Sequence, residues 1–222
     1  MAAEPRMLAL ALPPGPLRLL CLGAHADDVE IGCGGTVLRL LSEHPASTCR
    51  WIVFSGSGER AREARESANR FLAASAERRV EVLALSDGRF PTALSEIKDT
   101  LERVKGEFNP DVTFTHHRED RHQDHRTVSD ATWQTFRDHF ILEYEIPKYD
   151  GDLGAPNCFV ALAESTLKKK LSHLLDGFPS QRGRQWFSEE TFRALMRLRG
   201  VESAAPEGYA EGFYGRRVRL AP

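Results

Sequence analysis

The 222-residue chain lacks several features that would assign it to a class at once. It has no apolar run long enough to cross a bilayer, so we expect no membrane span. Its 30 basic and 32 acidic side chains leave a net charge of −2, which gives no electrostatic basis for binding nucleic acid. Its four cysteines show no CxxC pair and no disulfide spacing, which fits a reducing cytoplasm.

The composition that is present is that of an ordinary globular domain. Hydrophobic residues make up 41% and charged residues 28% of the chain, and 222 residues are enough to bury a sizeable core. A short apolar stretch near the N-terminus stops at Pro13, before it reaches the length of a secretion signal. We therefore expect one domain over residues 1–222, with residues 1–16 as a flexible N-terminal segment.

Segments of strand and helix character alternate along the chain. The apolar patterns predict strands at 17–23, 50–55, 80–85, 111–115, 141–146, 158–162 and 209–220. They predict helices at 35–42, 59–73, 94–107, 127–136, 164–175 and 188–198. This alternation indicates an α/β fold with a mostly parallel, Rossmann-like sheet and helices on both faces.

The most informative segment is residues 25–30 (His-Ala-Asp-Asp-Val-Glu), directly behind the first predicted strand. Charged side chains at the end of a buried strand are costly to desolvate without a partner, and a divalent metal is a common one. A second cluster, residues 122–125 (His-Gln-Asp-His), follows the fourth predicted strand. In a 3-2-1-4-5 strand order, assigned by analogy, both clusters border one crevice at the carboxyl ends of neighbouring strands.

These residue types suit a metal-dependent hydrolase. Catalytic zinc takes three protein ligands and leaves a position for water, whose pKa falls to roughly 7. His25, Asp28 and His125 are the predicted ligands, although iron or another divalent ion fits the same set. The remaining cluster residues have chemistry for supporting tasks: Asp27 as general base on the water, His122 as acid or oxyanion stabiliser, and Asp124 as the carboxylate that orients an imidazole.

At these positions the chain resembles the PIG-L/LmbE-like zinc-dependent de-N-acetylases. That family carries a His-Pro-Asp-Asp-x-Glu element after its first strand and a later His-x-Asp-His element, on a Rossmann-like sheet. The resemblance implies the same zinc ligands and catalytic residues, and the removal of an acyl group, usually acetyl, from an amino sugar. Two departures stand out: Ala26 replaces the proline, and Asp120 stands where some members have a tyrosine, so that His122 carries more of the oxyanion's stabilisation.

Contacts to the substrate are predicted at charged residues near the two clusters. Arg60, Arg62 and Arg65 open the helix after the second strand, where the family often has an arginine that touches the sugar, and Asp120 and Arg121 adjoin the second cluster. A solvated helix face is the plain alternative for the arginines. Four aromatic residues are candidates for stacking on a sugar or its aglycone, with core packing as their plain alternative: Trp186, Tyr209, Phe213 and Tyr214. His116 and His117 are further pocket candidates.

A different class, a non-catalytic relative that binds a nucleotide or sugar on the same sheet, stays open at this point. The G-x-G-x-x-G fingerprint of nucleotide binding is absent after the first strand, where acids occupy the phosphate path. A serine hydrolase is set aside, because the segment around Ser57 lacks the first glycine of G-x-S-x-G. We expect a small-molecule N-acylated amino sugar as the partner, and the sequence leaves a homo-oligomer possible.

Overall fold

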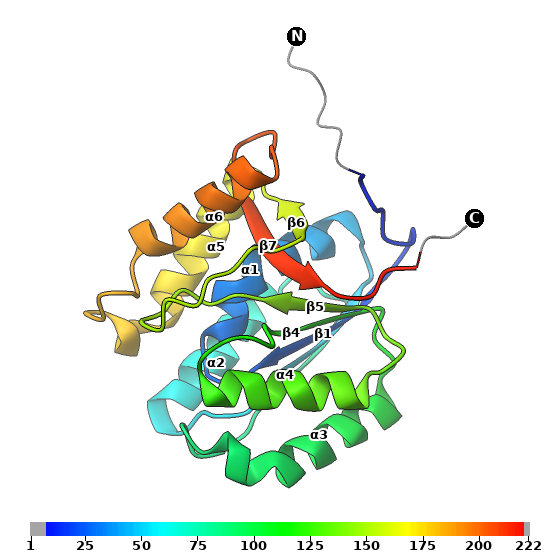
Figure 1. Cartoon of the computed structure of the whole chain (residues 1–222), viewed down its shortest axis with the longest axis vertical. Coiled ribbons are helices and arrows are strands. Elements are labelled where there is room, and N and C mark those ends of the chain that lie inside the picture. Colours follow the sequence, from blue (N-terminus) through cyan, green and yellow to red (C-terminus); the bar gives the residue numbers. More distant parts are fainter. Residues whose placement is uncertain (1–7, 220–222) are drawn as a thin grey trace.

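A twisted seven-stranded sheet forms the centre of the computed structural model, which describes residues 8–219 (Figure 1). The strands are β1 (Arg18–Gly23), β2 (Thr48–Val53), β3 (Glu77–Val82), β4 (Val112–His116), β5 (Ile141–Tyr144), β6 (Cys158–Ala161) and β7 (Ala210–Gly215). Their order is β3-β2-β1-β4-β5-β7-β6. The first five strands are parallel, which confirms the predicted fold class and the 3-2-1-4-5 order, and β7 is antiparallel to both of its neighbours.

Helices cover both faces of this sheet (Figure 1). They are α1 (Asp28–Glu43), α2 (Gly58–Phe71), α3 (Leu94–Glu107), α4 (Gln123–Thr135), α5 (Glu164–Gly177) and α6 (Glu189–Glu202). Two short 3₁₀ turns, η1 (Phe90–Ala93) and η2 (Pro179–Gln181), lie between them. Helices α3 and α4 pack against each other on one face, while α1, α2, α5 and α6 share the other. Each face buries its own apolar core against the sheet.

Several predicted boundaries are corrected by the structure. Helix α1 begins at Asp28, not at residue 35, and α4 begins at Gln123, not at residue 127. Strand β3 ends at Val82 and its first half is charged, because it is an exposed edge of the sheet. The closing strand runs only from Ala210 to Gly215. Residues 1–7 of the predicted N-terminal segment, and Leu220 of the predicted closing strand, lie outside the described residues; residues 8–16 form no helix or strand.

The early start of α1 depends on close packing against its glycines. A Cβ atom on Gly32 would lie 2.1 Å from Cδ2 of Tyr144, so only a glycine lets the helix approach β5 this closely. Tyr144 is fully buried, and its hydroxyl donates a hydrogen bond of 2.6 Å to the carbonyl of Leu22. The ring therefore has no space into which to retreat, and the glycine holds the first turns of α1 against the sheet.

We expect Gly32→Ala to destabilise the protein by about 1–3 kcal/mol, because the added methyl group overpacks the contact with Tyr144. Gly106→Ala is the matched control: it also replaces a helical glycine, but nothing lies within 4 Å of the added Cβ. Better helix propensity should make that variant more stable by up to about 1 kcal/mol. Urea denaturation of both variants checks this, and equal stabilities would contradict it.

Candidate active site and metal centre

The first cluster lies where β1 ends and α1 begins. Asp27 is the N-cap residue of α1 and Asp28 stands in its first turn, where the helix dipole favours an acid. The backbone N–H of His25 donates a hydrogen bond of 2.6 Å to Oδ2 of Asp28. The turn is thereby fixed so that His25 and Asp28 face the same space beyond the carboxyl end of the sheet.

The second cluster lies at the N-terminus of α4, next to the first. His122 is the N-cap residue, and its Nδ1 accepts a hydrogen bond of 3.3 Å from the backbone N–H of Asp124. His125 stands in the first turn of α4, with its ring stacked on His116 at a centroid distance of 3.9 Å. Two segments almost a hundred residues apart therefore meet because β1 and β4 are neighbours in the sheet.

The three predicted ligands are in contact with one another. Nε2 of His125 lies 3.2 Å from Nδ1 of His25. The carboxylate of Asp28 contacts both atoms: its Oδ1 lies 3.6 Å from Nε2 of His125, and its Oδ2 lies 3.4 Å from Nδ1 of His25. Atoms that share one tetrahedral ion at 2.0–2.1 Å are about 3.3–3.4 Å apart. The donor set of two imidazoles and one carboxylate, with this spacing, fits a divalent ion such as zinc.

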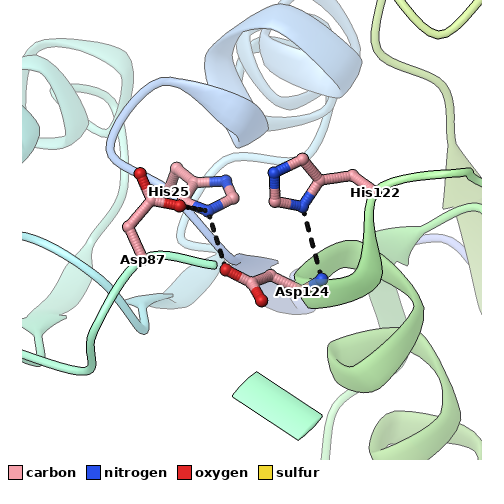
Figure 2. A group of neighbouring side chains, drawn as sticks. All are labelled: His25, Asp87, His122 and Asp124. Atoms are coloured by element: carbon pink, nitrogen blue, oxygen red, sulfur yellow. Dashed lines mark hydrogen bonds and ion pairs between the residues drawn. The ribbon is translucent and has the colours of Figure 1, made fainter. Parts of the chain in front are cut away.

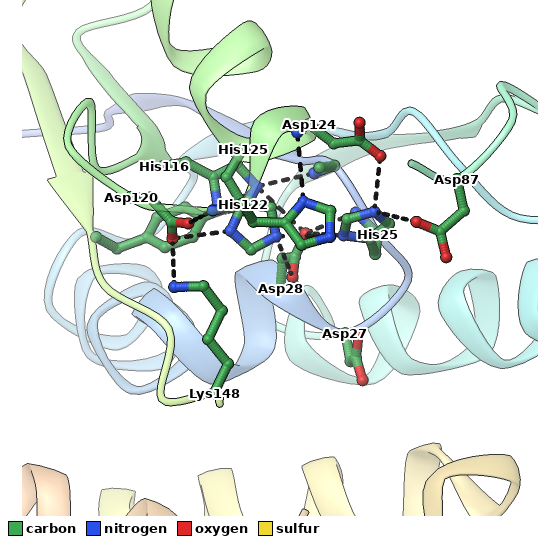
Figure 3. A network of polar contacts seen from close by, with 12 residues as sticks. His25, Asp27, Asp28, Asp87, His116, Asp120, His122, Asp124, His125 and Lys148 are labelled. Atoms are coloured by element: carbon green, nitrogen blue, oxygen red, sulfur yellow. Dashed lines mark hydrogen bonds and ion pairs between the residues drawn. The ribbon is translucent and has the colours of Figure 1, made fainter. Parts of the chain in front are cut away.

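Each of the two histidines has a carboxylate on its other ring nitrogen (Figure 3). Nδ1 of His125 lies 2.9 Å from Oδ2 of Asp120, and Nε2 of His25 lies 3.3 Å from Oδ2 of Asp124. Such partners orient a metal-binding imidazole and fix its tautomer. Asp124 thus makes the kind of contact with an imidazole that was predicted for it, and Asp120 makes the same kind of contact with His125.

Loop residues that the sequence analysis did not single out complete this network. Oδ1 of Asp87 lies 3.0 Å from Nε2 of His25 (Figure 2). The aspartate side chain is nevertheless 73% exposed. Gly88 and Phe90 donate backbone hydrogen bonds to Asp124, and Lys148 forms an ion pair of 3.0 Å with Asp120. No pattern marks Asp87 or Lys148 in the sequence, because the fold alone brings their loops to the site.

The electrostatics of the cluster follow from burial and the facing charges. Burial alone would raise the pKa of Asp28, but the surrounding imidazoles of His125, His116 and His25 hold it well below its usual range. Burial lowers the pKa of His125 to about 4, and His116 contributes to the same effect. His125 is therefore a neutral imidazole at pH 7, which is the form that binds metals.

Asp27 lies beside the ligands without contacting them, and its carboxylate is apart from the imidazoles in Figure 3. Its Oδ1 forms an ion pair of 3.0 Å with Nη2 of Arg60, and its buried Oδ2 has no hydrogen-bond partner. Burial raises the pKa of Asp27, while Arg60 opposes that shift. A buried carboxylate with one free oxygen and a raised pKa is suited to accepting a proton.

The other predicted contact residues divide between the site and the surface. Arg60 lies at the site, held by Glu63, by Ser180 and by the ring of Phe178. Arg62 is 65% exposed and pairs with Glu59, and Arg121 is exposed as well. Arg65 donates to backbone carbonyls within its own helix and on β3. The structure does not bring these three arginine side chains into contact with the ligands.

The aromatic and histidine candidates lie mostly in packed surroundings. Phe213 is buried in the apolar core, and the half-buried side chains of Trp186 and Tyr209 pack against that core. Tyr214 stacks on His117 at a centroid distance of 3.7 Å. His116 is fully buried and its Nε2 accepts a hydrogen bond from the backbone N–H of Ala24, so it supports the turn that carries His25.

Glu30, the last residue of the first cluster, is fully buried and neither of its carboxyl oxygens has a hydrogen-bond partner. Burial raises its pKa from 4.5 to about 8. The unfolded chain therefore ionises Glu30 near pH 4.5 and the folded chain only near pH 8, so this residue makes the protein less stable as the pH rises between the two values.

We expect Glu30→Gln to remove this effect, because glutamine is a neutral side chain of the same shape. Both proteins are compared without metal. The variant should have about the same free energy of unfolding as the wild type at pH 4.5 and a value roughly 2–4 kcal/mol higher at pH 8, since one pKa unit corresponds to about 1.4 kcal/mol. Urea denaturation across this pH range measures the difference. A gain that does not change with pH would show that Glu30 is not held protonated.

Comparisons with known proteins identify the family of the chain. Residues 20–136, more than half of the chain, match the model of the PIG-L family, described as GlcNAc-PI de-N-acetylase. The uncharacterised deacetylase YaiS of Escherichia coli (strain K12) is 31% identical over 137 residues, which are 58% of this chain and 74% of that relative. The chain therefore belongs to the PIG-L family of de-N-acetylases.

Solved structures share the fold at lower sequence identity. The conserved protein TT1542 of Thermus thermophilus superimposes with a TM-score of 0.71 and 22% identity, over 93% of this chain and 97% of that one. For the N,N'-diacetylchitobiose deacetylase of Pyrococcus horikoshii the TM-score is 0.61 with 21% identity, over 88% and 82%. GalB of Pseudomonas putida KT2440, a 4-carboxy-2-hydroxymuconate hydratase, gives 0.64 with 17% identity, over 93% and 98%. Since one fold also serves a hydratase, the reaction has to be argued from the site.

Proposed function

We propose that the protein is a zinc-dependent amidohydrolase that removes an N-acyl group, in the first place acetyl, from an amino sugar. The observation that carries the proposal is the contact among His25, Asp28 and His125, whose ligand atoms lie 3.2 to 3.6 Å apart. Family membership supports the de-N-acetylation, and the donor set supports the metal. When bound there, zinc supplies a Lewis acid that polarises a carbonyl and lowers the pKa of water to about 7.

The protein's own residues supply the proton transfers and the positioning. Asp27, with its free Oδ2, accepts the proton of the attacking water and thereby acts as general base. His122 lies beside two of the proposed ligands, with its ring centroid 4.9 Å from that of His25 and 4.6 Å from that of His125. Its Nδ1 accepts the hydrogen bond from the backbone of Asp124, so its Nε2–H is the group that donates to the oxyanion. Asp27 then returns the proton of the water to the leaving amine. Asp120 and Asp124 keep the two ligand imidazoles in place.

Arg60 is the residue that we assign to substrate contact. Its guanidinium is held beside Asp27 by the contacts with Glu63 and Ser180, and 27% of the side chain is exposed. Five N–H donors in a planar fork suit the hydroxyl groups of a sugar. Arg62 and Arg121, which were predicted for the same role, stay predictions, and both side chains are exposed.

The direct test is the release of a primary amine. The purified protein is incubated with N-acetylglucosamine, its nucleotide sugars and its glycosides, and the free amine is measured with a fluorogenic reagent. We expect release from at least one of these classes, loss of activity after removal of metal with a chelator, and recovery when zinc is added. Activity that survives complete removal of metal would contradict the proposal, and metal binding without amine release from any substrate would favour the non-catalytic alternative.

Three further expectations belong to this proposal. We propose a small-molecule substrate, a cytoplasmic location and no binding of nucleic acid. In residues 8–219 no helix has the length and apolar character that crossing a bilayer requires. The identity of the metal, the acyl length and a homo-oligomeric state stay predictions.

A further inference from the structure

A buried ion pair between Lys170 and Glu211 binds the backbone of α1, the helix that carries Asp28. Both residues are far in sequence from the proposed metal ligands. Lys170 on α5 and Glu211 on β7 are 1% and 3% exposed, and Nζ of Lys170 lies 2.6 Å from Oε1 of Glu211. The pair therefore connects two elements of the C-terminal part of the chain inside the folded core. Neither residue was singled out in the sequence analysis, and the proposed mechanism does not use them.

Both partners bind the backbone of α1 rather than other side chains. Lys170 donates a hydrogen bond of 2.6 Å to the carbonyl of Ile31. Glu211 accepts hydrogen bonds of 2.8 Å and 2.6 Å from the N–H groups of Gly35 and Thr36. In a regular helix the N–H of residue 35 donates a hydrogen bond to the carbonyl of residue 31. The ion pair therefore contacts both the donor and the acceptor of one helical hydrogen bond.

This step is adjacent to the turn that carries the site. The N–H of Ile31 donates a hydrogen bond of 3.0 Å to the carbonyl of Asp27, so Ile31 links Lys170 directly to the backbone of the proposed base. Gly35 is needed for the same arrangement, because a Cβ atom there would lie 2.9 Å from Oε1 of Glu211. The Gly-Gly-Thr segment at 34–36 thus lets a carboxylate reach the helix backbone.

A buried ion pair is a poor way to add stability alone. Desolvation of two charges offsets much of their attraction, and apolar residues of similar volume are often as stable or more stable. Here both charged groups also bind backbone groups of α1: Lys170 binds the carbonyl of Ile31 in the first turn, and Glu211 binds the N–H groups of Gly35 and Thr36 one turn further along. This use indicates a positional rather than a stabilising role.

We propose that Lys170 and Glu211 are positioning residues that hold the first turn of α1, with Asp27 and Asp28, in the orientation that the metal site requires. The inference rests on the proposed function, because it assigns the pair a purpose in metal binding. Replacement of both charged residues by apolar residues should preserve the core, while the first turn of α1 becomes more mobile.

The test compares the double variant Lys170→Met/Glu211→Leu with the wild type and with Leu41→Ala. Single variants would leave one charge buried without its partner and are prone to unfold, whereas the double variant leaves none. Leu41 is buried at the far end of α1, so its truncation weakens the same helix without touching the pair. Zinc affinity is measured by competition with a chromophoric chelator, and amide hydrogen exchange is measured on the metal-free chains.

We expect the double variant to keep a cooperative melting transition, to bind zinc about 10–100-fold more weakly, and to exchange the amide of Ile31 faster. Leu41→Ala should melt earlier but keep the zinc affinity and the protection of Ile31. Wild-type zinc affinity, or unchanged protection of Ile31, in the double variant would overturn the proposal. If the wild type itself binds no zinc, the proposed function fails, and so does the proposed effect of the ion pair on zinc affinity. If the wild type and the double variant bind zinc equally well, only the positioning role of Lys170 and Glu211 fails.

Discussion

Asp27→Asn is expected to reduce the rate of amine release by about 10²–10⁴-fold, which is the usual contribution of a general base. Asparagine has the same shape but accepts no proton from water, and the variant keeps an oxygen for the contact with Arg60. Because Asp27 makes no contact with the ligand atoms of His25, Asp28 or His125, metal binding should be retained. The loss should appear in kcat rather than in the zinc content of the purified protein.

The matched control is Asp99→Asn, an equally small change at an exposed position on α3. Both variants are compared with the wild type for kcat, KM and bound zinc per chain. Wild-type turnover in Asp27→Asn would remove this residue from the role of base. Loss of zinc together with activity would instead make Asp27 a part of the metal site.

His125→Ala is expected to remove most of the zinc affinity, because it deletes one of the three proposed ligands. The loss should exceed the 10–100-fold that removal of an outer partner typically costs. Asp120→Asn provides that comparison, since Asp120 is not a proposed ligand and contacts Nδ1 of the His125 ring at 2.9 Å. The two variants should therefore rank in the order wild type, Asp120→Asn, His125→Ala.

Zinc affinities from chelator competition at pH 7.5 give this ranking directly. His117→Ala is a suitable control, because His117 follows the same strand but contacts Glu143 and Tyr214 instead of the ligands. Its zinc affinity should equal that of the wild type. Equal affinities for His125→Ala and His117→Ala would show that the ion, if bound, lies elsewhere.

The parallel sheet could be predicted because buried parallel strands are short apolar runs. Its 3-2-1-4-5 strand order was taken by analogy with doubly wound sheets, since no residue pattern in the chain fixes it. The early start of α1 could not be predicted, since glycines usually interrupt helices. Gly32 is instead required by the contact with Tyr144, which lies more than a hundred residues away. The insertion of β7 between β5 and β6 also depends on packing that no local pattern records.

The contact among His25, Asp28 and His125, the proposed ligands, could be predicted for a related reason: two compact motifs at the ends of neighbouring strands carry them. The partners of those ligands were harder to assign. Asp120 was expected at the substrate, yet its carboxylate lies between His125 and Lys148. Asp87 reaches His25 from a loop whose sequence carries no metal motif. Such contacts depend on how loops from β3, β4 and β5 meet, which only the folded chain determines.

X-ray absorption spectroscopy of the zinc-loaded protein tests the central claim most directly. If the two remote segments bind one ion, its first shell consists of nitrogen and oxygen atoms at about 2.0–2.1 Å. The spectrum should also contain outer-shell scattering from two imidazole rings, and from only one ring in His125→Ala. Sulfur in the first shell, or a spectrum that the substitution of His125 leaves unchanged, would contradict the account.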